Sequence, residues 1–193
     1  MSFAPADALF SAEQIKQRVA ELGAEITAAF DGHDLSVVTL LKSGMVFMAD
    51  LIRQIPLDTT CHFLRVASTR DEGAVRTDIV YSTEIRYGGR HVLIVDDIVD
   101  TGITLAFLLD HIRLQKPSSL KVCALIDKPG ERKTDVHPDW AAFTIAEPEA
   151  DRFLVGYGLD YAERYRGLPY IGTIPRPATR AAVPGDLPGV FRK

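Results

Sequence analysis

Three carboxylates, followed by hydroxyl residues and a glycine, are the part of the sequence best suited to chemistry. Asp96, Asp97 and Asp100 come directly after the apolar run at 92–95, and the segment 101–104 leads into leucines at helical spacing. The apolar run predicts a buried strand of a parallel sheet, and the leucines predict a helix. Because free N–H groups at a helix N-terminus attract phosphate, this order of elements predicts a phosphate site.

Other interpretations of this stretch fit its surroundings less well. The loop lacks the pattern GxxxxGK[ST], which argues against a cradle for a nucleoside triphosphate. The three acids also resemble the aspartate-rich motif of prenyl-diphosphate enzymes. Those enzymes carry the motif on a helix of an all-helical chain, whereas a β-branched strand leads into it here. A plain connecting loop with solvated acids remains as the alternative.

A second loop is expected at the same edge of the sheet. Lys42, Ser43 and Gly44 close the expected first strand at 35–41 and open a helix. Since ligands of doubly wound sheets bind beyond the carboxyl ends of the strands, this lysine and the exposed backbone donors predict a second phosphate site beside Asp100. The alternative is a solvated lysine at the start of a helix.

Composition favours a single soluble domain with an ordinary core. The 193 residues are 47% hydrophobic and 25% charged. The 22 basic and 26 acidic residues give a net charge of −4, which argues against a general affinity for nucleic acid or anionic membranes. Without a secretory leader or a run of membrane-spanning length, we expect a cytoplasmic protein. Cys61 and Cys123 lie in apolar, strand-like contexts and are expected to be core thiols.

Strand-like and helical segments alternate along the chain, which predicts a parallel α/β sheet. Ser11 and Gln14 form an expected capping box before a helix that reaches residue 30. Further strands are expected at 61–66, 77–81 and 120–126, with a polar mobile loop at 68–76. From residue 134 short strands at 140–145, 153–157 and 170–174 indicate a small cap, and from 175 the chain is proline-rich.

The stretch 91–109 closely resembles the phosphoribosyl-diphosphate-binding motif of the type I phosphoribosyltransferases. The stretches 125–129 and 153–172 narrow the resemblance to the hypoxanthine-guanine phosphoribosyltransferases. The resemblance covers about residues 10–174. It implies a twisted parallel sheet flanked by helices with a small hood. The expected domain is 1–174, with a core at about 31–130, a hood from the N-terminal helix and 134–174, and a tail at 175–193.

The resemblance also implies roles for the residues at matching positions. Around the phosphoribosyl group, Asp100 is the general base. The 5′-phosphate is bound by Asp100, Thr101, Gly102, Ile103 and Thr104, and the ribose and magnesium by Asp96 and Asp97. The residues that bind pyrophosphate are Lys42, Ser43, Gly44 and Arg166, and a cis peptide bond precedes Lys42. The residues that bind the purine are Lys128, Phe153, Leu154 and Asp160, and Asp160 is also a magnesium ligand. Ser68 and Thr69 belong to the lid loop.

Three positions depart from the pattern of the family. Thr69 stands where relatives carry a lid tyrosine, which puts closure of the lid in doubt. Ile103 stands where many relatives carry a lysine, although backbone N–H groups rather than that side chain bind the phosphate. Asp96 stands where many relatives carry glutamate, and either acid can reach a ribose diol.

The implied reaction joins hypoxanthine or guanine to 5-phosphoribosyl 1-diphosphate with Mg²⁺, and gives IMP or GMP and pyrophosphate. Asp100 is expected to accept the proton of purine N7, and the ammonium of Lys128, a pure donor, suits the O6 carbonyl. Family members form dimers or tetramers, so a homo-oligomer is expected, without nucleic-acid or membrane partners. The alternatives are a transferase for another base such as xanthine, and a non-catalytic regulator that binds RNA. The acidic charge and the purine motif argue against the regulator.

Overall fold

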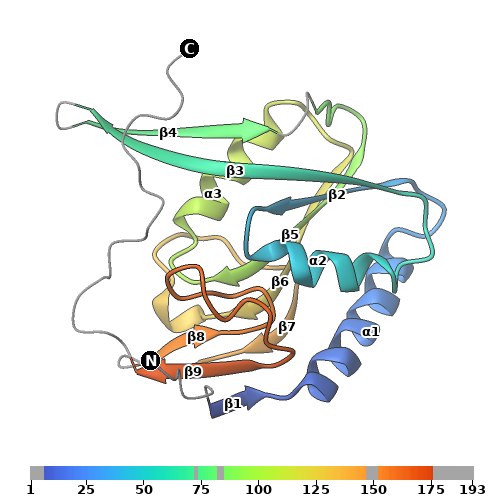
Figure 1. Ribbon diagram of the computed structural model, residues 1–193. Helices are drawn as coiled ribbons and strands as arrows, with labels where there is room; N and C mark the ends of the chain where they lie inside the picture. Colours follow the sequence, from blue (N-terminus) through green and yellow to red (C-terminus); the bar gives the residue numbers. More distant parts are fainter. Residues whose placement is uncertain (1–6, 72–73, 82–84, 147–151, 176–193) are drawn as a thin grey trace.

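A computed structural model of the chain describes residues 7–71, 74–81, 85–146 and 152–175 (Figure 1). Its larger sheet has six strands. In spatial order they are β4 (Ala74–Tyr81), β3 (Thr59–Asp71), β2 (Leu35–Leu40), β5 (His91–Val99), β6 (Ser119–Asp127) and β7 (Trp140–Thr144). All neighbours pair in parallel except β4, which is antiparallel to β3. The predicted parallel α/β sheet is therefore confirmed.

Helices cover both faces of this sheet. α1 (Ala12–Ala29) and α2 (Gly44–Ile52) pack on one face, and α3 (Ile103–Arg113) packs on the other. The central strand β5 shows why: Leu93 and Val95 belong to the core cluster of α1 and α2, whereas Val92 and Ile94 belong to that of α3. Successive side chains of a strand point to opposite faces, so an unbroken apolar run is buried on both. None of the described helices has the length and apolar composition of a membrane span.

A smaller antiparallel sheet forms the hood beside the N-terminal end of α1 (Figure 1). It contains β1 (Asp7–Phe10), β9 (Ile171–Pro175) and β8 (Arg152–Val155). β7 pairs with β6 in the large sheet, although the sequence placed all of 134–174 in the hood. No long helix lies between β6 and β7, so the alternation that marks a parallel crossover is missing from the sequence there. The crossover consists instead of the short 3₁₀ helix η1 (Pro129–Glu131) and a loop.

Asp96 and Asp97, the acid pair, lie inside strand β5 rather than after it. The expected strand ended at residue 95, but β5 continues to Val99, and Asp96 and Ile98 still pair with Ala124 and Ile126 of β6. Pairing with β2 ends at Val95, so it is pairing with β6 that carries the strand through residues with low strand propensity. The acid pair is therefore held on the rigid sheet.

The predicted mobile loop at 68–76 is largely a hairpin. β3 reaches Asp71 and β4 begins at Ala74, with Ser68 opposite Thr77 and Thr69 opposite Arg76. Residues 72–73 lie outside the described residues. Because β3 and β4 pair with each other through their backbones, each strand continues beyond the apolar run from which it was predicted.

The capping box at the start of α1 is confirmed. The Gln14 N–H donates to the Ser11 hydroxyl at 3.3 Å, and the Ser11 N–H donates to the Gln14 side-chain oxygen at 2.8 Å. These bonds satisfy two of the donors that a helix start leaves free. They fix where α1 begins, directly after β1 of the hood.

The two cysteines differ in burial. Cys123 is buried and Cys61 is exposed, and both are free thiols. The expectation of two core thiols is therefore wrong for Cys61. Cys61 begins the apolar part of β3, but its side chain is exposed, and the periodicity of so short a run does not predict which residues are buried.

Candidate functional site

Three loops meet at one edge of the sheet. β2, β5 and β6 are parallel neighbours, so their carboxyl ends lie side by side. Lys42, Asp100 and Lys128 follow these three ends in turn. Sites of doubly wound sheets form at this edge, and the sequence-based prediction that these loops share it is confirmed.

The acid pair occupies a small pocket at the end of β5. Asp96 is 5% exposed, and its carboxylate accepts the N–H of Asp97 at 3.0 Å. Burial, and then the charge of Asp97, raise the pKa of Asp96 well above its usual range. Burial also raises the pKa of Asp97, while hydrogen bonds from Asp96 and Ser43 lower it. Two acids so placed favour a bound cation or a shared proton.

The pocket of about 160 Å³ around this pair extends to the start of α3. Its lining includes Asp96, Asp97, Asp100, Gly102 and Thr104, whereas Thr101 and Ile103 do not line it. Gly102 precedes α3 with a φ of 76°, the left-handed conformation that glycine adopts most readily. The first turn of α3 thus begins beside the acids, with the free N–H groups of a helix N-terminus next to the pocket.

Two cationic side chains, Lys42 and Arg166, lie at the loop that follows β2. The peptide bond Leu41–Lys42 is cis, as the resemblance implies. Arg166 comes from the far end of the chain, and one of its Nη atoms donates to the Ser43 hydroxyl and to the Gly158 carbonyl, each at 2.9 Å. The structure therefore brings Lys42, Ser43 and Arg166 together, as the sequence predicted.

Glu163 bridges these cations, and the sequence did not single it out. Its carboxylate lies 3.0 Å from the Lys42 ammonium and 3.4 Å from Arg166. The hydrogen bond from Lys42 is the main cause that lowers the pKa of Glu163. An anion already sits where two cations converge, so the spot suits a second anion that displaces it.

Asp160 does not line the pocket of the acid pair. Its carboxylate contacts Arg166 at 2.8 Å and accepts the Glu163 N–H at 2.8 Å. Within the described ranges, no three His, Cys, Asp or Glu side chains gather closely enough to hold a metal ion together. A metal bound here would thus be completed by oxygens of a substrate, in keeping with the few protein ligands that Mg²⁺ uses.

A second small pocket, of about 170 Å³, adjoins the first. It is lined by Ile98, Asp100, Lys128, Glu131, Arg152, Phe153 and Leu154. The Phe153 ring is 38% exposed and packs edge-on against Tyr161 at a centroid distance of 5.6 Å. Lys128 is 14% exposed and pairs with Glu131 at 3.0 Å. The pocket combines an open aromatic face with a nearly buried donor, and this suits a planar polar ring.

Asp100 lines both small pockets, together with Ile98. Of the residues predicted for the purine, Lys128, Phe153 and Leu154 are brought together, and Asp160 does not line the pocket. Sequence reasoning missed Glu131 and Arg152 beside this pocket. Arg152 directly precedes the stretch at 153–172 that resembles the family, and this adjacency could have pointed to Arg152.

The fold and the two pockets define an α/β protein with an acid pair near the carboxyl end of a central strand, beside a helix N-terminus that suits a phosphate ligand. Residues 5–162 match the family model of the phosphoribosyl transferase domain. The chain is 41% identical over 170 residues to the hypoxanthine-guanine phosphoribosyltransferase of Bacillus subtilis, covering 86% of this chain and 91% of that one. The corresponding protein of Mycobacterium avium is 45% identical over 176 residues, covering 86% and 84%.

A solved structure agrees with these matches. The crystal structure of a hypoxanthine-guanine phosphoribosyltransferase from Bacillus anthracis superposes with a TM-score of 0.78 at 39% identity, covering 87% of this chain and 97% of that one. The chain belongs to the phosphoribosyltransferase family.

Proposed function

We propose that this protein transfers the 5-phosphoribosyl group of 5-phosphoribosyl 1-diphosphate to hypoxanthine or guanine in purine salvage, with release of pyrophosphate. The observation that carries the proposal is the position of Asp100 between two pockets, one lined by acids and the start of α3, the other by Phe153 and Lys128. The similarity to relatives named for this activity supports it.

The phosphoribosyl group belongs in the pocket beside α3. Residues 100–104 offer its 5′-phosphate the Thr104 hydroxyl, which lines the pocket, and the N–H groups of a helix N-terminus. Asp96 and Asp97 face the ribose diol. The pyrophosphate lies towards Lys42, Ser43, Gly44 and Arg166, where it takes the place of the Glu163 carboxylate.

The donor set fits Mg²⁺, which prefers carboxylate and phosphate oxygens and retains water. The residues that would hold it are Asp96 and Asp97, with Asp160 as a further candidate ligand. When bound, it neutralises charge on the leaving pyrophosphate. The raised pKa of Asp96, caused by burial and by Asp97, fits a pair that is more stable beside a cation.

The base belongs in the second pocket. Phe153 stacks against the purine ring, the backbone of Leu154 lies at its edge, and Lys128 donates to O6. Asp100 accepts the N7 proton as the glycosidic bond forms, which makes the base a better nucleophile towards a ribosyl centre that gains positive charge.

Other features of the proposal rest on the sequence. Four points stay predictions: the lid role of Ser68 and Thr69, the homo-oligomeric state, the cytoplasmic location and the domain boundary at residue 174.

A closed lid would keep water from the ribosyl cation. With Thr69 in place of tyrosine, we expect some pyrophosphate release without nucleotide, which Thr69→Tyr would reduce.

Turnover of radiolabelled bases with 5-phosphoribosyl 1-diphosphate tests the function. We expect IMP and GMP to form at comparable rates, xanthine to react less well and adenine hardly at all. A preference for xanthine would identify a transferase for another base. Binding of the diphosphate without turnover of any base would favour the non-catalytic regulator, for which RNA binding is the next measurement.

Removing either acid of the pair should raise the magnesium requirement. For Asp96→Asn or Asp97→Asn we expect the Mg²⁺ concentration at half-maximal rate to rise roughly tenfold, the scale for losing one group around a metal. Affinity for the diphosphate should fall with it. Asp110→Asn, on the exposed face of α3, is the matched control. Titration of Mg²⁺ at fixed substrate measures the shift, and unchanged curves would mean that the two acids are merely solvated.

Gly102→Ala should disturb the phosphate loop. A Cβ there would lie 2.3 Å from the Thr134 hydroxyl and 3.0 Å from the Arg132 Cδ, at a φ of +76°. The left-handed conformation alone costs a side chain about 1–2 kcal/mol. We expect a lower melting temperature and weaker calorimetric binding of the diphosphate. Gly167→Ala, which has no atom within 4 Å, is the control, and equal affinities in the two variants would contradict a tight role for Gly102.

A further inference from the structure

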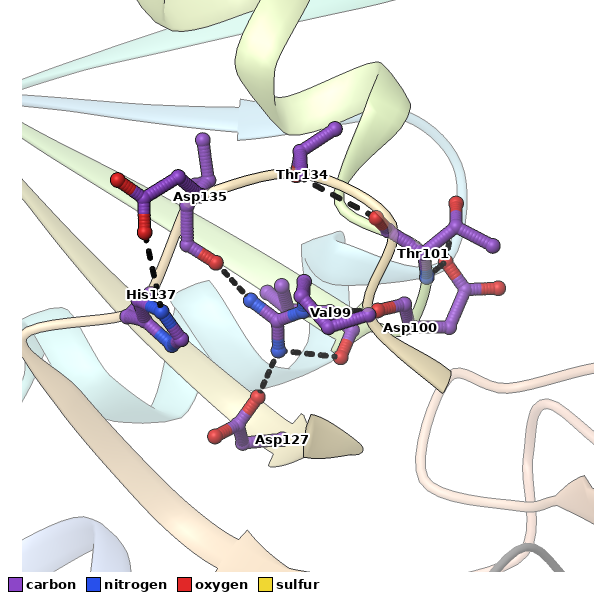
Figure 2. A network of polar contacts seen from close by, with 9 residues as sticks. Val99, Asp100, Thr101, Asp127, Thr134, Asp135 and His137 are labelled. Atoms are coloured by element: carbon purple, nitrogen blue, oxygen red, sulfur yellow. Dashed lines mark hydrogen bonds and ion pairs between the residues drawn. The ribbon is translucent and has the colours of Figure 1, made fainter. Parts of the chain in front are cut away.

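Arg132 is buried directly behind the loop that carries Asp100, and the proposed reaction gives it no role. Its side chain is 7% exposed. Its Nε donates to the Asp100 carbonyl at 2.9 Å, and one Nη donates to the Val99 carbonyl at 3.2 Å and to the Asp127 carboxylate. The other Nη donates to the Val136 carbonyl (Figure 2). These bonds engage four of the five N–H groups of the guanidinium, so Arg132 serves the protein rather than a substrate.

The residues on either side of Arg132 continue the same contact. The Lys128 N–H donates to the Val99 carbonyl at 2.9 Å, and the Lys133 N–H donates to the Thr101 carbonyl at 2.9 Å. The Thr134 hydroxyl also lies 3.4 Å from the Thr101 carbonyl (Figure 2). Three consecutive carbonyls, at 99, 100 and 101, are therefore all held by the segment 128–134.

This arrangement sets the direction of the opposite backbone groups. In a trans peptide the N–H points away from the C=O. Holding the carbonyls of 99–101 towards Arg132 therefore turns the N–H groups of Asp100, Thr101 and Gly102 to the other side. The Thr101 N–H accordingly donates to the Asp100 carboxylate, away from the segment 128–134. The carboxylate and these N–H groups are thus oriented before any ligand binds.

We propose that Arg132 is a positioning residue for phosphoribosyl transfer, which holds the backbone of Val99 and Asp100 so that the Asp100 carboxylate and the phosphate-loop donors keep one orientation. This rests on the proposed function, since it concerns the base assigned to Asp100. Asp127 offsets the buried charge of the guanidinium. A planar fork reaches carbonyls on several sides at once, which the single ammonium of a lysine cannot do.

Arg132→Lys keeps the charge beside Asp127 and removes the fork. We expect kcat for hypoxanthine to fall about 10²-fold, because a displacement of about 1 Å at a catalytic group has an effect of that size. Calorimetric affinity for 5-phosphoribosyl 1-diphosphate should also weaken. The matched control is Arg113→Lys, whose exposed guanidinium pairs with Asp110 at 3.0 Å, and its kcat should stay unchanged.

A double variant separates positioning from mere support of the fold. In an Asp100→Asn background, Arg132→Lys should lower kcat little further, since the group that it orients can no longer accept a proton. Losses that multiply, or a kcat of the folded protein that stays at the wild-type value while the melting temperature falls, would overturn the proposal.

Two further measurements cover the other outcomes. If Arg132→Lys does not fold, Asp127→Asn loosens the same guanidinium more gently and should show the same coupling to Asp100→Asn with a smaller drop in kcat. If the wild-type protein turns over no purine, the proposed function fails. The diphosphate affinities of the Arg132 and Arg113 variants then still test whether Arg132 holds the phosphate loop, and equal affinities would overturn that part as well.

Discussion

Asp100→Ala is expected to lower kcat by roughly 10²- to 10⁴-fold, the range for loss of a general base. Asp100 lines both small pockets, and its carboxylate accepts the Thr101 N–H, so it is held at the junction of the two pockets proposed for ribose and base. Affinity for 5-phosphoribosyl 1-diphosphate should change little, because the proposed function assigns phosphate binding to backbone N–H groups and a hydroxyl of 101–104 rather than to the Asp100 carboxylate. Steady-state rates with hypoxanthine and calorimetry with the diphosphate measure the two quantities separately.

Asp100→Asn sharpens this test. Asparagine keeps an oxygen that can accept the Thr101 N–H, but it cannot take up the N7 proton. We expect its kcat to fall nearly as far as that of Asp100→Ala, with diphosphate affinity even closer to wild type. Asp110→Ala, an exposed aspartate of α3, controls for loss of a carboxylate as such. Retention of near-wild-type turnover in either Asp100 variant would remove Asp100 from the chemistry.

The parts of the site that the sequence predicted are those set by local order along the chain. A buried apolar strand, a loop with acids and a helix with periodic leucines place Asp100 and Gly102 within a few residues of one another. The same holds for Lys42 after β2. Parallel strands align their carboxyl ends, so the two loops meet without further information.

What the sequence could not supply depends on contacts between distant segments. β7 joins the large sheet through pairing with β6, and no helical periodicity announces that crossover. Arg132 and Glu163 are ordinary charged residues by composition. Only the folded chain shows that the Arg132 guanidinium binds the carbonyls of Val99, Asp100 and Val136. It also shows that the Glu163 carboxylate lies between Lys42 and Arg166.

Lys128 should decide which purines react. The ammonium is a donor only, so it suits the O6 carbonyl of hypoxanthine or guanine and opposes the amino group of adenine. Its 14% exposure and its place in the pocket with Phe153 argue against a plain surface lysine. A site built around such a polar contact rejects the wrong group by roughly 10⁴-fold, because the buried partner is left without a bond. We therefore expect kcat/KM for adenine to lie about 10⁴-fold below that for hypoxanthine.

Variants of Lys128 and its partner test this assignment. Lys128→Ala should lower kcat/KM for hypoxanthine far more than that for adenine, so that most of the preference is lost. Glu131→Gln removes the charge that pairs with the ammonium at 3.0 Å, and it should preserve the preference, since the donor remains. Lys121→Ala, an exposed lysine of β6, the strand that ends just before Lys128, is the control and should leave the rates with all four bases unchanged. Adenine turnover within tenfold of hypoxanthine in the wild type, or an intact preference in Lys128→Ala, would place the specificity of the pocket elsewhere, with the Leu154 backbone as the next group to examine.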